Sequence, residues 1–204
     1  MSLAYPVTPQ PALLFIDVLN GFFTPEGALY YPDVKAVVDP LRQLRDTARR
    51  TGRLIVYVTE QHRAGLFDFE DLHLPSHLVH GEADAVPFDD FVPAGAANEV
   101  ALPKRRYSAF FGTDLDLLLR EQHVDRVVIA GVKTNVCVRA TVQDAFAAGY
   151  RVIVPRAATN SNRPHLARAS LEDIEHYFGR VVDMDEALGI LRGDKRAGDP
   201  ETAT

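Results

Sequence analysis

Three side chains whose chemistry suits covalent catalysis each follow an apolar run that is typical of a buried strand. Asp17 comes directly after the first of these runs, Lys104 after the third, and the single cysteine, Cys137, just past the fourth. A thiolate is a strong nucleophile, a nearby lysine lowers the pKa of a thiol, and a carboxylate can carry a proton from the thiol to a leaving amine. These residue types therefore suit acyl transfer to a cysteine.

Cys137 lies in the segment GVKTNVCVRATVQDAF, where the strand pattern gives way to a helical one. The positive end of a helix near the sulfur predicts a lowered thiol pKa and an accessible thiolate. Each residue also has an ordinary interpretation: a lone cysteine packs as a small hydrophobe, Asp17 caps a turn, and Lys104 is a solvated charge in the basic trio 104–106. The residues alone leave both interpretations open.

The elements that would position these side chains alternate along the chain. Continuous apolar runs predict six buried strands, at 12–16, 54–58, 100–103, 127–132, 152–154 and 181–182, and Pro103 is expected to end the third. Helical spacing of apolar residues predicts helices around 37–48, 115–119, 138–149, 171–178 and 185–191. The alternation predicts one α/β domain over residues 1–192, with a mostly parallel six-stranded sheet between two helical layers. Ligands bind such sheets at the carboxyl ends of the strands.

Two segments depart from this alternation. Residues 60–98 form a connection far longer than the median of about 4–6 residues, and their aromatic and histidine content predicts an ordered active-site loop. Residues 193–204, with the sequence GDKRAGDPETAT, are predicted to form a flexible tail.

Composition excludes several classes of function. The formal net charge of −6 argues against a nucleic-acid surface, and no apolar run approaches the roughly 20 residues of a membrane span. The N-terminus lacks the pattern of a secretory signal, and one cysteine suits a reducing compartment, so we expect a cytoplasmic protein with a small-molecule substrate. The chain contains no GxSxG, HExxH, GxxxxGK[ST] or GxGxxG motif.

Three blocks in order resemble the isochorismatase-like cysteine hydrolases: LLFIDVLNGFF, KRRYSAFFGTDLDLLL and VVIAGVKTNVCVRATVQDAFAAGYRVIVPRAAT. This family includes nicotinamidases, N-carbamoylsarcosine amidase, ureidoacrylate amidohydrolase and biuret hydrolase. The resemblance covers nearly the whole chain and is weakest over residues 64–97. It implies the isochorismatase-like fold, a homo-oligomer (dimer or tetramer), and a triad of Asp17, Lys104 and Cys137. In that triad the aspartate is general base and acid, the lysine stabilises the thiolate, and the cysteine forms a thioester that water hydrolyses.

The resemblance also implies a cis peptide bond between Val132 and Lys133, and an oxyanion hole made by the backbone N–H groups of Lys133 and Cys137. Isochorismatases proper cleave a vinyl ether and lack the nucleophilic cysteine, so Cys137 indicates C–N hydrolysis instead. The predicted reaction is hydrolysis of a small amide or of a carbamoyl or ureido compound, with release of ammonia.

Candidates for the substrate pocket flank the triad in the sequence; they are Asn20, Phe22, Tyr107, Phe110 and Asn135. Core packing of the aromatic residues and helix capping by Asn135 would explain the same residues without a substrate. Arg63 or Arg106 is a candidate partner for a substrate carboxylate, because guanidinium matches a carboxylate in a bidentate manner, and a surface role is equally open for either.

A metal site is a further hypothesis. Metal-binding nicotinamidases, which this region resembles, have an Asp-x-His motif after the second strand, a further histidine six residues on and a later histidine. Here Glu60-x-His62 and His77 match that pattern loosely, and Asp68 occupies the position six residues after His62. Imidazole and carboxylate groups ligate divalent metals, but the prediction is no metal and no cofactor. A non-catalytic binding module and a thiol redox sensor also stay open, although the chain has no second cysteine to resolve a sulfenate.

Overall fold

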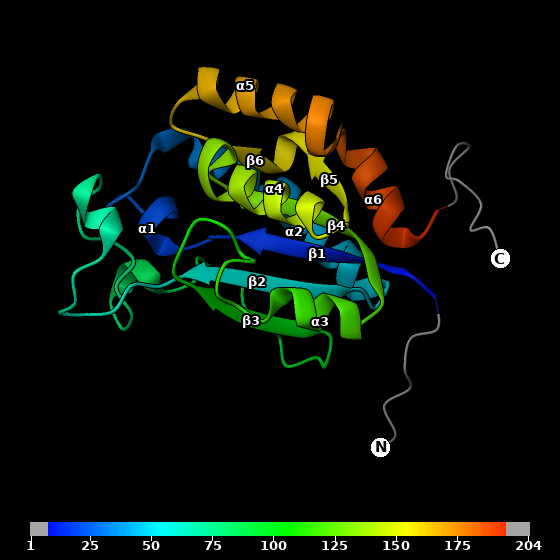
Figure 1. Cartoon of the computed structure of the whole chain (residues 1–204), viewed down its shortest axis with the longest axis horizontal. Coiled ribbons are helices and arrows are strands. Elements are labelled where there is room, and N and C mark those ends of the chain that lie inside the picture. Colours follow the sequence, from blue (N-terminus) through cyan, green and yellow to red (C-terminus); the bar gives the residue numbers. More distant parts are fainter. Residues whose placement is uncertain (1–7, 195–204) are drawn as a thin grey trace.

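The structure is a computed structural model that describes residues 8–194, and its strands form one parallel sheet (Figure 1). The strands are β1 (Gln10–Ile16), β2 (Leu54–Glu60), β3 (Glu99–Lys104), β4 (Val124–Val132), β5 (Arg151–Pro155), β6 (Thr159–Asn160) and β7 (Gly179–Val182). Their order across the sheet is β3-β2-β1-β4-β5-β7, and the two-residue β6 pairs with the end of β4. The predicted six-stranded α/β sheet is confirmed, with β6 as a short addition.

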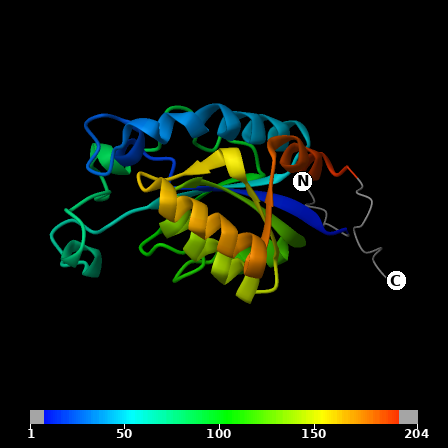
Figure 2. The ribbon, with the colours of Figure 1, turned by 90° about the horizontal axis from the view of Figure 1, so that it is seen from above.

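Helices cover both faces of the sheet and give the three predicted layers. The α-helices are α1 (Asn20–Phe23), α2 (Val38–Arg50), α3 (Leu115–Glu121), α4 (Arg139–Ala147), α5 (Pro164–Asp173) and α6 (Met184–Arg192). The apolar sides of α2 and α6 share one core with the sheet, whereas α3, α4 and α5 pack in a second core on the other face. Figure 2 shows these two groups of helices on opposite sides of the strands.

β1 shows why its sequence is a continuous apolar run. Leu13 and Phe15 point into the core under α2, and Ala12, Leu14 and Ile16 point into the core under α3 and α4. Successive side chains of a strand face opposite sides, so a strand covered by helices on both faces has no position for a polar residue. The first polar side chain after the run, Asp17, therefore lies where the strand leaves the sheet.

The end of β3 differs from the prediction. Pro103 does not stop the strand: it pairs in register with Thr59 of β2, and Lys104 pairs with Glu60. β3 is an edge strand with a neighbour on one side only, and such a strand tolerates a proline because some of its N–H groups have no partner strand. The strand thus carries Lys104 to the carboxyl edge of the sheet.

Residues 61–98 connect β2 to β3 and extend beyond the carboxyl ends of the strands, next to α1 (Figure 1). Two 3₁₀ helices, Phe69–Leu72 and Ala83–Ala85, lie in this segment, and a bridge between His62 and Val79 closes part of it. Glu60, expected in the loop, is the last residue of β2.

At the other end of the chain, Gly193 ends α6 with a φ of 82°. The predicted flexible tail lies, from residue 195 onward, outside the described residues. Between residues 8 and 194, no helix combines the length and the apolar character that crossing a membrane would require.

Candidate active site

The three residues predicted to carry the chemistry lie together at the carboxyl edge of the sheet. Asp17 directly follows β1, Lys104 ends β3, and Cys137 lies in the π-helical turn Thr134–Val138 that leads into α4. Their exposed fractions are 0%, 1% and 3%. Lys104 Nζ is 3.0 Å from Asp17 Oδ2, and Cys137 Sγ lies within 4.8 Å of a carboxylate oxygen of Asp17. The fold therefore brings a carboxylate, an ammonium and a thiol into one buried site.

Asp17 is held by the neighbouring strand β2. Its backbone has a φ of 54°, in the left-handed region that few residues other than glycine adopt. The Asp17 N–H donates to the carbonyl of Val58 at 3.0 Å, and Asp17 Oδ1 accepts from the Glu60 N–H at 2.9 Å. With Oδ1 fixed by β2, the other oxygen, Oδ2, faces Lys104.

Glu60 is a fourth member of this site, and it is absent from the predicted catalytic residues. Its Oε2 lies 3.3 Å from Lys104 Nζ and accepts a hydrogen bond from Cys137 Sγ at 3.7 Å. The sequence did contain a signal: Glu60 ends β2, and β2 lies between the strands whose ends carry Asp17 and Lys104.

Burial and mutual contact shift the pKa values of the charged groups. Burial raises the pKa of Asp17 to about 6; Lys104 opposes that shift, and the negative charge of Glu60 adds to it. Burial alone would lower the pKa of Lys104, but Asp17, the thiol and Glu60 surround its ammonium, and the net pKa is raised. Lys104 therefore keeps its positive charge, and Asp17 is a carboxylate that can take a proton near neutral pH.

The predicted lowering of the Cys137 pKa is wrong for this site. Burial is the largest influence and raises the pKa of the thiol, Glu60 and Asp17 raise it further, and only Lys104 lowers it. The helix start that is visible in the sequence is outweighed by desolvation and by two adjacent carboxylates. The thiol consequently keeps its proton at rest and needs a base to become a nucleophile.

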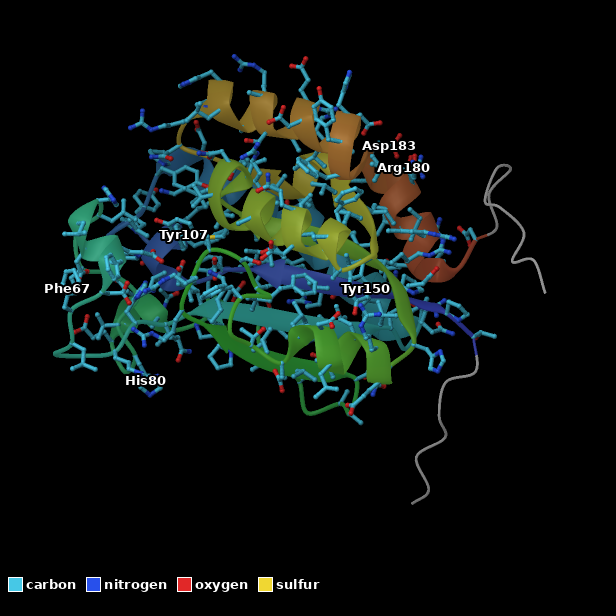
Figure 3. All side chains as sticks on the ribbon, viewed as in Figure 1. Phe67, His80, Tyr107, Tyr150, Arg180 and Asp183 are labelled. Carbon is cyan, nitrogen blue, oxygen red and sulfur yellow. The ribbon has the colours of Figure 1, made fainter. Side chains whose placement is uncertain are left out.

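Cys137 opens onto a cavity of about 180 Å³, which is below the range of about 300–1,000 Å³ typical of ligand pockets. The cavity is lined by Phe22, Leu29, Glu60, His73, Leu74, His77, Tyr107, Lys133, Val136 and Cys137. Figure 3 places Tyr107 at the α1 end of the sheet and Tyr150 and Arg180 at the opposite end. Only a small substrate fits here.

Two of the five predicted pocket residues, Phe22 and Tyr107, line this cavity. The remaining three do not. Asn20 begins α1, where its carbonyl accepts from Thr24; Phe110 packs with its ring centre 5.9 Å from that of Tyr150. Asn135 Oδ1 is buried and has no hydrogen-bond partner within residues 8–194. Closeness in sequence to the triad is therefore a weak guide to which side chains line this cavity.

The predicted oxyanion donors, the N–H groups of Lys133 and Cys137, lie just before and within the π-helical turn. The peptide bond between Val132 and Lys133 is cis, and Lys133 directly precedes the turn that holds Cys137. The Lys133 side chain runs along the cavity wall, with Nζ 5.6 Å from the ring centre of Phe22 and 5.6 Å from that of Tyr31.

The arginines considered for a substrate carboxylate lie elsewhere. Arg63 and Arg106 line a different cavity, on the outer side of Lys104. Arg106 Nη1 is 3.0 Å from Asp68 Oδ1, and Arg105 Nη2 is 3.0 Å from Asp68 Oδ2. Burial would raise the pKa of Asp68, but the hydrogen bonds it accepts outweigh burial and lower it. Asp68 is thus already paired with cations.

A second buried cluster, the histidine–glutamate cluster of His62, Glu70 and His77, adjoins Glu60. Its nitrogen and oxygen atoms lie within 4.8 Å of one another. His62 Nε2 is 3.9 Å from both Glu70 Oε2 and Glu60 Oε1, and His77 Nε2 is 3.8 Å from Glu70 Oε2. Within the described part of the chain, His62 Nε2 and both carboxylate oxygens of Glu70 have no hydrogen-bond partner.

This donor set fits a divalent cation. His62 Nδ1 contacts Asp68 Oδ2 at 3.1 Å and His77 Nδ1 contacts the carbonyl of Pro75 at 2.7 Å, so both Nε2 atoms face the cluster. Tetrahedral ligands of Zn²⁺ lie about 3.3–3.6 Å apart, slightly closer than these atoms do. In the absence of a cation, burial and the charge of Glu60 raise the pKa of Glu70 to about 7. The set considered from the sequence was Glu60, His62 and His77, and the structure groups Glu70 with the two histidines.

A family model and two relatives match the sequence of this chain over most of its length. A family model described as the isochorismatase domain matches residues 11–186. The maleamate amidohydrolase of Pseudomonas putida is 36% identical over 186 residues, which cover 90% of this chain and 87% of the relative. The N-carbamoylsarcosine amidase of an Arthrobacter species is 30% identical over 189 residues, which cover 89% and 71%.

Among solved structures, the pyrazinamidase of Pyrococcus horikoshii in complex with zinc superimposes with a TM-score of 0.78. It is 30% identical, and the match covers 86% of this chain and 99% of that one. The likeness in sequence and in fold thus extends over most of the chain, and the range of the family model includes Asp17, Lys104 and Cys137.

Proposed function

The chain belongs to the isochorismatase family, and on that basis we propose that it is an amidohydrolase that cleaves a C–N bond through a thioester on Cys137. The substrate is a small amide, or a carbamoyl or ureido compound, and ammonia is released. The observation that carries this proposal is the buried contact of Lys104 with Asp17 beside Cys137, at the edge of a 180 Å³ cavity. The amidohydrolase and amidase among its relatives support the reaction class.

In the first half of the reaction, Asp17 takes the proton of the Cys137 thiol while the sulfur attacks the carbonyl carbon of the amide. The raised pKa of the thiol makes this base necessary, and the raised pKa of Asp17, about 6, suits a group that must both accept and return a proton. The backbone N–H groups of Lys133 and Cys137 receive the negative charge of the carbonyl oxygen. Asp17 then protonates the leaving nitrogen, the C–N bond breaks, and ammonia departs.

In the second half, Asp17 takes a proton from a water molecule whose oxygen attacks the thioester carbon. The C–S bond breaks, the proton returns from Asp17 to the sulfur, and the acid product leaves. Lys104 stays charged throughout and stabilises both the Asp17 carboxylate and the developing thiolate, because its ammonium lies close to both groups. Glu60 positions that ammonium from the opposite side.

The histidine–glutamate cluster favours a second candidate, a metal-assisted amidase. His62, Glu70 and His77, together with Glu60, would hold the cation, which when bound polarises a carbonyl or activates a water molecule. The chain's own residues keep both imidazoles oriented through their Nδ1 contacts, and Glu60 connects the cluster to Lys104.

Ammonia release from a panel of amides tests the proposal. The panel contains maleamate, N-carbamoylsarcosine, biuret, ureidoacrylate, nicotinamide and simple aliphatic amides, each assayed with and without added Zn²⁺ or Mn²⁺. We expect at least one compound to be hydrolysed, activity to be lost in Cys137→Ala, and mass spectrometry to detect an acyl adduct on Cys137 during turnover.

Two outcomes would contradict the proposal. Hydrolysis that continues in Cys137→Ala removes the thioester route. No hydrolysis across the panel, combined with the absence of any acyl adduct on Cys137, favours a binding module instead. A redox sensor would lose its free thiol rapidly under mild peroxide, and the burial and raised pKa of Cys137 argue against that role.

A further inference from the structure

A second lysine near Cys137 has a side chain that the proposed reaction does not use. Lys133 is half-buried, and its Nζ lies over the rings of Phe22 and Tyr31 at 5.6 Å from each centre. Aromatic faces attract an ammonium group, so the two rings hold this charge at the wall of the cavity. Phe22 itself lines the cavity together with Lys133 and Cys137.

The two lysines near the thiol differ in how their charges are compensated. Lys104 lies 3.0 Å from Asp17 Oδ2 and 3.3 Å from Glu60 Oε2. Lys133 forms no ion pair with any carboxylate of residues 8–194. Burial lowers the pKa of Lys133, the Cys137 sulfur partly opposes that shift, and the positive charge of Arg163 adds to it. Lys133 is therefore a basic side chain at the cavity wall that has aromatic contacts but no carboxylate partner within residues 8–194.

We propose that the Lys133 side chain binds a carboxylate of the substrate, which makes the substrate a small amide that also carries a carboxylate group. The inference rests on the proposed function, because it requires the amide carbon to lie at Cys137 Sγ while the carboxylate reaches Lys133. The volume of about 180 Å³ keeps the two groups only a few bonds apart. A carboxylate and an ammonium form a charge-assisted contact that is stronger than a neutral hydrogen bond.

Acidic groups at the cavity wall favour one orientation of such a substrate. Glu60 and His77 also line the cavity, and Glu70 Oε2 lies 3.8 Å from His77 Nε2. The carboxylates there repel a substrate carboxylate, whereas Lys133 attracts it. The acidic and basic walls therefore direct the carboxylate end toward Lys133 and present the amide to Cys137.

A pair of probes that differ only in charge tests this site. Succinamate carries an amide and a carboxylate, and succinamide carries a second amide in place of the carboxylate. In the wild-type protein we expect a higher kcat/KM for succinamate, mainly through a lower KM. In Lys133→Met, the ratio of kcat/KM for succinamate to that for succinamide should fall about ten- to hundredfold. Lys133→Arg should restore part of the ratio, and the matched surface variant Lys35→Met should keep it at the wild-type value.

A binding measurement separates this inference from the proposed function. Calorimetry with Cys137→Ala should show tighter binding of succinamate than of succinamide, and addition of Lys133→Met should remove the difference. Tighter binding of succinamate than of succinamide, without hydrolysis of any amide, would contradict the proposed function but not the carboxylate site. Hydrolysis without a preference for the charged probe, or an equal loss of kcat for both probes in Lys133→Met, would overturn the carboxylate site and assign Lys133 to the oxyanion instead.

Discussion

The triad and the histidine–glutamate cluster meet at Glu60 and differ in how their buried charges are satisfied. In the triad, the ammonium of Lys104 contacts two carboxylates. In the cluster, the contacts of the Glu70 carboxylate with the two imidazoles and with Arg106 are longer, at 3.8–3.9 Å. Burial of a polar group is costly unless it is paired. The ammonium of Lys104 therefore already has close counterions within the chain, whereas the spacing of the cluster leaves room for a divalent cation between its ligand atoms.

The largest effect on hydrolysis is expected from removing the ammonium of Lys104 in the triad. Lys104→Met leaves Asp17 and Glu60 facing each other without a cation, and we expect kcat/KM for amide hydrolysis to fall about 10³-fold or more. Removal of one partner of a buried ion pair also costs about 3–5 kcal/mol of stability, which thermal unfolding will detect. Lys35→Met, an exposed lysine exchanged in the same way, is the control. Retention of a tenth of the activity in Lys104→Met would contradict the assigned role.

The decrease in kcat/KM at acid pH, the acid limb of the pH profile, tests the effect of the Glu60 charge, which lies between the triad and the histidine–glutamate cluster. Asp17 must be ionised to act as base, and its pKa is about 6, so kcat/KM should fall tenfold per unit as the pH drops below about 6. The charge of Glu60 helps to raise that pKa. Glu60→Gln removes the charge and should move the limb toward lower pH by about 0.5–1 unit. Glu82→Gln, at an exposed glutamate, should leave the limb in place, and a shift of the limb toward higher pH in Glu60→Gln would refute this electrostatic account.

Substitutions in the histidine–glutamate cluster are expected to change hydrolysis less and to weaken metal binding strongly. Calorimetry with Zn²⁺ and Mn²⁺ should show binding to the wild-type protein that weakens at least tenfold in His77→Ala and in Glu70→Gln. His80→Ala serves as the control, because His80 contacts Gln61 and lies outside the cluster. Equal affinity in all variants would place the metal elsewhere, and no binding to the wild-type protein would end the parallel with metal-assisted amidases.

The sequence predicted the fold and the proximity of Asp17, Lys104 and Cys137 because both depend on local pattern. Asp17 and Lys104 each follow an apolar run, and parallel strands bring their carboxyl ends to one edge. Glu70 and the Lys133 side chain were missed for a physical reason: residues 61–98 have no regular period, and the direction of a side chain on a wall depends on what packs around it. The direction of the Cys137 pKa shift was wrong because desolvation and the contact with Glu60 arise only in the folded chain.

The reacting groups and the cavity walls come from parts of the molecule with different tolerance for change. Asp17 follows β1 and Lys104 ends β3, so strands of the sheet fix both, whereas His73 and Leu74 belong to the irregular segment beyond the sheet (Figure 1). Exchange of the second pair alters the shape of the pocket without disturbing strand register. Such a scaffold can acquire new substrates by few mutations, and a library confined to the segment 61–98 and position 133 would explore that range while the hydrolytic chemistry stays in place.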